Sequence, residues 1–120
     1  MREIKFRAWD KIGKQGMLGW SKIIETGIEL FFKDNFGFYL MQYTGLKDKQ
    51  GNEIYEGDII KWRNTIGDEI KDVVIWSELS HGFSVSRTPE VCCVLSGSDG
   101  SHIEVIGNIY ENPELLKEPK

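Results

Sequence analysis

The sequence predicts a mainly β fold, and two observations carry this expectation. Apolar and charged side chains alternate near the N-terminus, where Ile4, Phe6 and Ala8 are interleaved with Lys5 and Arg7. This period of two is typical of a strand with one buried face. Along the rest of the chain, short apolar runs are separated by turn residues, and almost no helical period occurs. The 120 residues are enough for one domain or for two small lobes that share a core.

Residues 1–42 are expected to form an N-terminal lobe built on a β-hairpin. The first strand lies around residues 4–8. The segment from Asp10 to Gly16 contains two glycines and two lysines, which suits a hairpin connection into a second strand at residues 17–20.

Residues 23–32 leave three alternatives open: one strand, two strands broken at Gly27, or a short helix. Their β-branched and aromatic content favours strands. A turn at residues 33–35 and a strand at residues 36–42 follow.

Residues 43–57 are expected to form an ordered junction. Lys47–Asn52 is a solvated turn, and Glu56-Gly57-Asp58 marks a second turn just before an apolar run.

Residues 58–112 have the proportions of a small SH3-like barrel packed with the first lobe. Five strands are predicted there, at residues 58–63, 73–76, 82–86, 91–95 and 103–110. Polar turn-like segments separate them, at residues 64–72, 77–81 and 96–101, and Gly107 marks a possible bulge.

Residues 113–120 are expected to form a short helical turn followed by a frayed tail. Asn112 suits the N-cap and Pro113 the first helical position. One integrated domain is an alternative to this division into lobes.

The net charge of −4 is unevenly distributed. Residues 1–42 hold seven Lys/Arg and five Asp/Glu, a balance of +2, whereas residues 43–112 hold six and twelve, a balance of −6. An acidic second half argues against a broad phosphate-binding surface there. No apolar run reaches the roughly 20 residues that span a bilayer, and the N-terminus lacks the apolar block of a signal peptide. A cytoplasmic protein without membrane contact is therefore expected.

Three blocks of the sequence resemble the YopX family of phage and prophage proteins. They are REIKFRAWD at residues 2–10, YTGLKDKQGNEIYEGDII at residues 43–60 and IEVIGNIYENPELL at residues 103–116. The resemblance implies a small, mainly β protein encoded by a bacteriophage or prophage and present in a bacterial host cell. It also implies self-association. It implies no activity, and it provides no catalytic or binding residues to transfer.

Lys61-Trp62-Arg63 has a pattern suited to binding, and the basic face of the first strand, with Lys5 and Arg7, is a second candidate contact whose favoured interpretation is a solvated sheet face. A Trp between two cations can stack on a nucleobase while the cations meet phosphates, as in single-stranded nucleic-acid binders. The favoured interpretation is that Trp62 closes the core and that its two neighbours face water.

Two further groups of residues give a weaker indication of a chemical function. Glu56 and Asp58 share one face of a strand and could act as an acid–base pair, although a turn role is the favoured interpretation. The second group is a set of four residues of metal-ligating types, whose spacing matches no zinc site: His81, Cys92, Cys93 and His102. The adjacent cysteines are expected to be reduced thiols in a buried strand, with a rare vicinal disulfide as the alternative.

No nucleotide-binding or hydrolase motif occurs, so no enzyme activity, cofactor or metal is expected. Aromatic residues make up 12% of the chain, and a cluster within residues 31–41 exceeds what one strand pair needs. This cluster indicates either an oligomer interface or a core shared by two lobes. The resulting expectation is a non-enzymatic accessory protein that acts through protein–protein contacts as a homo-oligomer, with a host or phage protein as a further partner.

Overall fold

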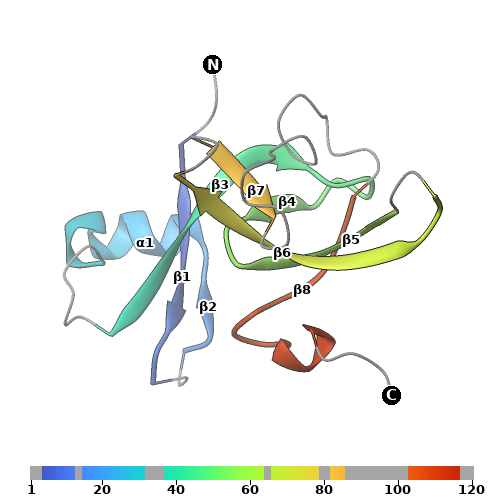
Figure 1. Cartoon of the computed structure of the whole chain (residues 1–120). Helices are drawn as coiled ribbons and strands as arrows, with labels where there is room; N and C mark the ends of the chain where they lie inside the picture. Colours follow the sequence, from blue (N-terminus) through green and yellow to red (C-terminus); the bar gives the residue numbers. More distant parts are fainter. Residues whose placement is uncertain are drawn as a thin grey trace. The chain divides into compact units, whose positions relative to one another are not determined.

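The computed structural model divides the chain into two compact units, Met1–Tyr43 and Thr44–Lys120. It describes residues 4–12, 15–31, 37–63, 66–78, 82–85 and 103–116. Within these ranges eight strands form two antiparallel four-stranded sheets, with the strand orders β2-β1-β3-β4 and β7-β6-β5-β8 (Figure 1). The predicted mainly β class is confirmed. Strand β3, Phe38–Lys47, begins in the first unit and ends in the second.

The first unit contains the predicted N-terminal hairpin. Strand β1 (Phe6–Asp10) pairs antiparallel with β2 (Met17–Leu18) on one side and with the first half of β3 on the other. Ala8 stands opposite Leu18 and Leu40 in these pairs. Since opposite residues share a face, these three side chains lie on the same side of the sheet.

A short helix covers that side of the sheet, and the preference for strands within residues 23–32 is wrong. Helix α1 spans Trp20–Thr26, and a 3-10 turn, η1, follows at Ile28–Leu30. Ile23 is fully buried with Ala8 and Phe31, so its tertiary contacts outweigh its β-branched propensity. Gly27 ends the helix with φ of 112°, a conformation that favours glycine, and its N–H donates to the Ile23 carbonyl.

The second unit is built on the second half of β3 and five further strands. They are β4 (Glu53–Tyr55), β5 (Asp58–Arg63), β6 (Glu69–Ser77), β7 (Gly82–Val85) and β8 (Glu104–Asn108). The predicted strand at residues 58–63 is confirmed to the residue. Strand β6 begins earlier than predicted, because the pairing with β5 continues through Trp62 opposite Ile70 and Arg63 opposite Glu69. The expected turn at residues 64–72 is therefore shorter.

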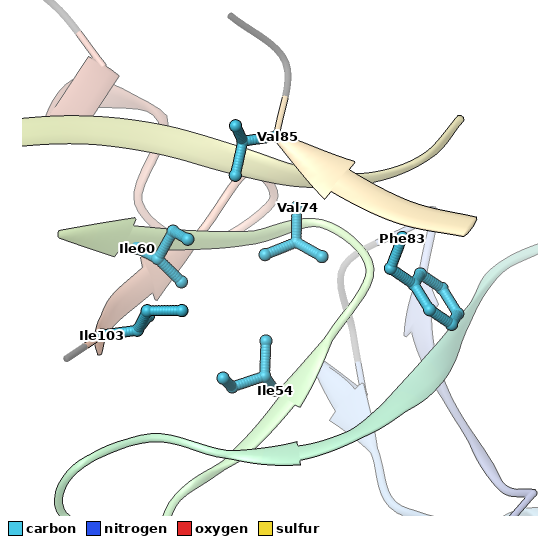
Figure 2. Packing of buried hydrophobic residues seen from close by; sticks show 6 residues of the cluster. All are labelled: Ile54, Ile60, Val74, Phe83, Val85 and Ile103. Atoms are coloured by element: carbon cyan, nitrogen blue, oxygen red, sulfur yellow. The ribbon is translucent and has the colours of Figure 1, made fainter. Parts of the chain in front are cut away.

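A compact apolar core lies inside the second unit. Its buried side chains come from β4, β5, β6, β7 and the residue just before β8, and they are Ile54, Ile60, Val74, Phe83, Val85 and Ile103. Figure 2 shows these side chains gathered between the strands. Burying one such aliphatic side chain stabilises the folded state by about 1.5–3 kcal/mol. The SH3-like description of this unit stays a prediction.

The C-terminal end of the second unit has a bulge and a helical turn. Gly107 pairs with Ile59 and Val105 pairs with Ile60, so Ile106 is the extra residue, one position before the predicted site. The predicted helical turn is confirmed as a 3-10 turn, η2, at Pro113–Leu116.

Several predicted features lie outside the described residues. They are the turn at 33–35, the strand at 91–95, the turn at 96–101, the tail at 117–120, and the residues His81, Cys92, Cys93 and His102. Among the described helices, none is long and apolar enough to cross a membrane.

Candidate functional site

Asp10, at the end of the first family-like block, holds a turn. Its side chain is 5% exposed, and its two carboxylate oxygens accept hydrogen bonds from the backbone N–H of Ile12 at 2.9 Å and of Gln15 at 3.1 Å. Short-range bonds of this kind fix the path of a connection between strands. The Asp10 carboxylate thus fixes the geometry of the β1–β2 hairpin.

Asp48, in the second block, also holds a turn, and it bonds in addition to a residue far along the chain. Its carboxylate accepts from the backbone N–H groups of Gln50 (2.9 Å), Asn52 (2.8 Å) and Val105 (2.9 Å), and from the Asn52 side-chain amide (3.3 Å). The Lys49 N–H donates to the Ile103 carbonyl at 3.0 Å. The β3–β4 turn is therefore bonded to the beginning of β8, 57 residues along the chain.

The pKa of Asp48 reflects this environment. Burial alone would raise it, but hydrogen bonds from Val105, Asn52 and Gln50 favour the charged form and lower the pKa below its ordinary value. A carboxylate held by that many amides is a structural anion rather than a proton acceptor at neutral pH.

Asp58 is bonded to the backbone, as the turn interpretation predicts. It is 1% exposed and accepts from the Tyr55 N–H at 2.8 Å. The preceding Gly57 has φ of 84°, donates to the Val74 carbonyl and accepts from the Ile109 N–H, both at 2.9 Å. Glu56 is half-buried. The Glu56–Asp58 segment thus ties β4, β6 and the C-terminal corner together.

The third block contains a corner that sequence reasoning missed. The Asn108 side chain is 7% exposed; its oxygen accepts from the N–H groups of Tyr110 and Glu111, and its nitrogen donates to the Glu111 carboxylate. Asn112 bonds back to Asn108 rather than capping η2 with its side chain, because its side-chain oxygen accepts from the Asn108 N–H at 3.3 Å. The spacing Asn-x-x-x-Asn-Pro was the available signal.

The predicted triad Lys61-Trp62-Arg63 lies at a shallow open hollow of about 260 Å³. Lys49, from the β3–β4 turn, and Glu69, from β6, complete its described lining. These two residues come from other elements, so only the tertiary structure could associate them with the triad.

Trp62 contributes to the core as well as to the hollow. It packs against the core cluster of the second unit, on the same face of β5 as Ile60. Its Nε1 atom is buried and has no hydrogen-bond acceptor among the described residues. Lys61 and Arg63 project from the opposite face of the strand, the first half-buried and the second exposed.

The cations at the hollow alternate with carboxylates. Lys61 Nζ lies 3.4 Å from Glu104 Oε1 and 3.9 Å from Glu69 Oε2. Lys49 Nζ lies 3.6 Å from the same Glu104 oxygen, and Arg63 Nη2 lies 3.9 Å from Glu69 Oε2. Three cations and two carboxylates leave a local excess of one positive charge. Such partly exposed pairs stabilise the fold by at most about 1 kcal/mol each.

Within the described part of the chain, no group of three or more His, Cys, Asp or Glu side chains could hold a metal ion. Asp10, Asp48 and Asp58, in the first two blocks, accept hydrogen bonds from backbone amides. The hollow combines charged side chains with Trp62 among its lining residues. Fold and site together define a small, mainly β protein of two units with turn-fixing signature residues.

The chain belongs to the YopX protein family, whose model matches residues 14–117. The predicted resemblance is therefore confirmed. The matched range contains the second and third blocks, and residues 2–10 precede it.

The structure is also similar to the crystal structure of protein EF1440 from Enterococcus faecalis, with a TM-score of 0.64 and 25% sequence identity. The similarity covers 98% of this chain and 100% of that one. The comparison with curated proteins finds no match.

Proposed function

We propose that this protein is a non-enzymatic accessory protein of a bacteriophage or prophage, which acts in the host cytoplasm through protein–protein contacts and as a homo-oligomer. The observation that supports this most is the use of the family-block carboxylates. Asp10, Asp48 and Asp58 are buried and bonded to backbone amides, which is a role in folding rather than in acid–base chemistry.

Exposed aromatic side chains supply contact area for a protein partner. Trp76 on β6 is 47% exposed and meets Phe83 edge to face, with ring centroids 5.2 Å apart. In the first unit, Tyr39 is 45% exposed, and Lys11 Nζ lies 4.6 Å from its ring centroid. Trp and Tyr are, with Arg, the residue types enriched at the positions that contribute most of the binding energy.

Light scattering across micromolar concentrations tests the oligomer. We expect a mass above that of one chain, and a shift toward smaller species in Trp76→Ala. Ile66→Ala is the control, because Ile66 is a 79% exposed apolar residue in the β5–β6 connection and should leave the mass unchanged. A wild-type protein that stays strictly monomeric would contradict the proposal.

A second candidate function is single-stranded nucleic-acid binding by Lys61, Trp62 and Arg63. The favouring observation is that all three residues line one hollow with Lys49. The paired glutamates and the −6 balance of residues 44–120, eight Lys/Arg against fourteen Asp/Glu, oppose it.

Titration of the protein's tryptophan fluorescence with oligonucleotides at low salt decides this second candidate. Arg63→Ala is the informative variant, because Arg63 is exposed and its removal leaves the core intact. Binding that weakens in Arg63→Ala and with added salt would support the candidate, and an unchanged fluorescence would reject it.

A further inference from the structure

We propose that the hollow beside Trp62 is an anchor site for a carboxylate on an acidic peptide segment of a partner protein. The proposal rests on the proposed protein-contact function and names its surface. The hollow belongs entirely to the second unit, since its described lining residues come from the β3–β4 turn, β5 and β6.

The cations at the hollow have N–H donors available for a further hydrogen bond. Their distances to glutamate oxygens, 3.4–3.9 Å, exceed the roughly 2.7–2.9 Å of a charge-assisted hydrogen bond. Arg63 uses Nη1 for the Gly67 carbonyl at 3.0 Å, but its Nη2 lies 3.9 Å from the nearest carboxylate oxygen. An entering carboxylate would find the ammonium of Lys61 and the guanidinium of Arg63 on one face of β5.

Trp62 provides an aromatic reporter at the hollow. It is one of the lining residues, and its side chain packs against the core on the face of β5 opposite to Lys61 and Arg63. Its buried N–H belongs to that core face, so the donors open to an entering carboxylate are those of the two cations.

Charge selects a single carboxylate over a chain of phosphates. Glu69 and Glu104 lie among the cations and would repel the successive charges of a nucleic acid. Glu69 Oε2 lies 3.9 Å from both Lys61 Nζ and Arg63 Nη2, so one further carboxylate beside these cations would balance the local excess of one positive charge. Charge complementarity of this kind gives a contact its specificity.

The size of the hollow suits one side chain of a partner rather than a cofactor. The volume of about 260 Å³ lies below the roughly 300–1,000 Å³ of ligand pockets. Pockets that receive one anchoring residue of a partner are typical of protein interfaces.

Indole proton–nitrogen NMR spectra test the proposal directly. The chain has four Trp residues, and Trp62→Phe identifies the Trp62 signal. The probes are the blocked peptide Ac-Gly-Glu-Asp-Glu-Gly-NH2, its Gln/Asn counterpart, and a short oligothymidylate. We expect the acidic peptide to shift the Trp62 signal saturably and the amide peptide to leave it in place.

Single-residue variants test where the carboxylate of the peptide binds. Arg63→Ala should weaken the response to the acidic peptide about two- to fivefold, as expected for the loss of one partly exposed ion pair. Lys47→Ala is the matched control, because Lys47 is an exposed lysine of the same unit outside the described lining of the hollow. Thermal unfolding of each variant verifies that the fold is retained.

The proposal would be overturned by equal responses to the acidic and amide peptides. A Trp62 signal that moves only with oligothymidylate would also overturn it and would favour nucleic-acid binding. If the Trp62 signal does not shift and the protein self-associates, the anchor site is refuted and the proposed protein-contact function is retained. If the acidic peptide shifts the signal saturably and the protein is strictly monomeric, only the proposed homo-oligomer is refuted.

Discussion

Replacing Asp48 with Asn is expected to destabilise the second unit at neutral pH, and the size of the effect follows from the bonds of the carboxylate. One oxygen of Asp48 accepts from Gln50 and Asn52, and the other accepts from Val105 and from the Asn52 amide. Asn keeps one acceptor but places an NH2 group where the second oxygen was. At least the bond to the Val105 N–H is then lost.

A hydrogen bond to a charged group is worth about 1.5–3 kcal/mol, so Asp48→Asn should lower the free energy of unfolding by about that amount. The N–H groups of Gln50 and Asn52 belong to exposed residues and can turn to water, which limits any additional loss. Urea unfolding followed by tryptophan fluorescence measures the difference. Gln50→Ala is the control, since exposed substitutions usually stay within about 0.5 kcal/mol.

The effect of Asp48 depends on pH in a defined direction. Its folded-state pKa is depressed, so its contribution to stability is complete above the unfolded-state pKa of about 3.9. The contribution is lost as the pH falls from there through the folded-state pKa. The gap between wild type and Asp48→Asn should therefore shrink across this acid range. A variant within 0.5 kcal/mol of wild type at neutral pH, or a gap that stays constant in acid, would refute the reasoning.

Two other substitutions probe packing. Gly107→Ala would place a Cβ 2.6 Å from Asn112 Oδ1, so we expect a loss of about 1–3 kcal/mol in urea unfolding. The added Asn112→Gly change should recover part of that loss, and two strictly additive effects would contradict the close contact. Ile60→Ala should lower the free energy of unfolding by about 2–5 kcal/mol, because Ile60 is fully buried in the second unit. Ile24→Ala, at a position that is 57% exposed, should change it by under 0.5 kcal/mol, and similar losses for both would argue against the described core.

Local sequence patterns were sufficient to predict a strand whose buried side chains face a single core. Strand β5 was predicted to the residue because Asp58 begins it after a glycine turn and its apolar run has clear limits. The helical turn at Pro113 was likewise predicted from one dipeptide, Asn112-Pro113. Helix α1 was not, because β-branched Ile23 and Ile24 favour strands locally, and only contact with Ala8 and Phe31 makes the helix the better solution.

The candidate site shows the same division. Lys61, Trp62 and Arg63 are consecutive, so sequence alone could place an aromatic ring between two cations. Lys49 and Glu69 join them through strand pairing and through the bond from Asp48 to β8, and neither has a local sign of this role.

The sequence by itself determined that this is a mainly β protein of the YopX family, because strand alternation, turn residues and family blocks are all local features of the chain. Tertiary structure decided which backbone amides the carboxylates of the block residues bind. Each of Asp10, Asp48 and Asp58 could have been catalytic, exposed or turn-fixing, and the choice depends on which N–H groups the fold brings within 3.1 Å of its carboxylate. Hydrogen bonds between distant residues, such as Asp48 and Val105, exist only after the chain has folded, so no pattern along the chain encodes them.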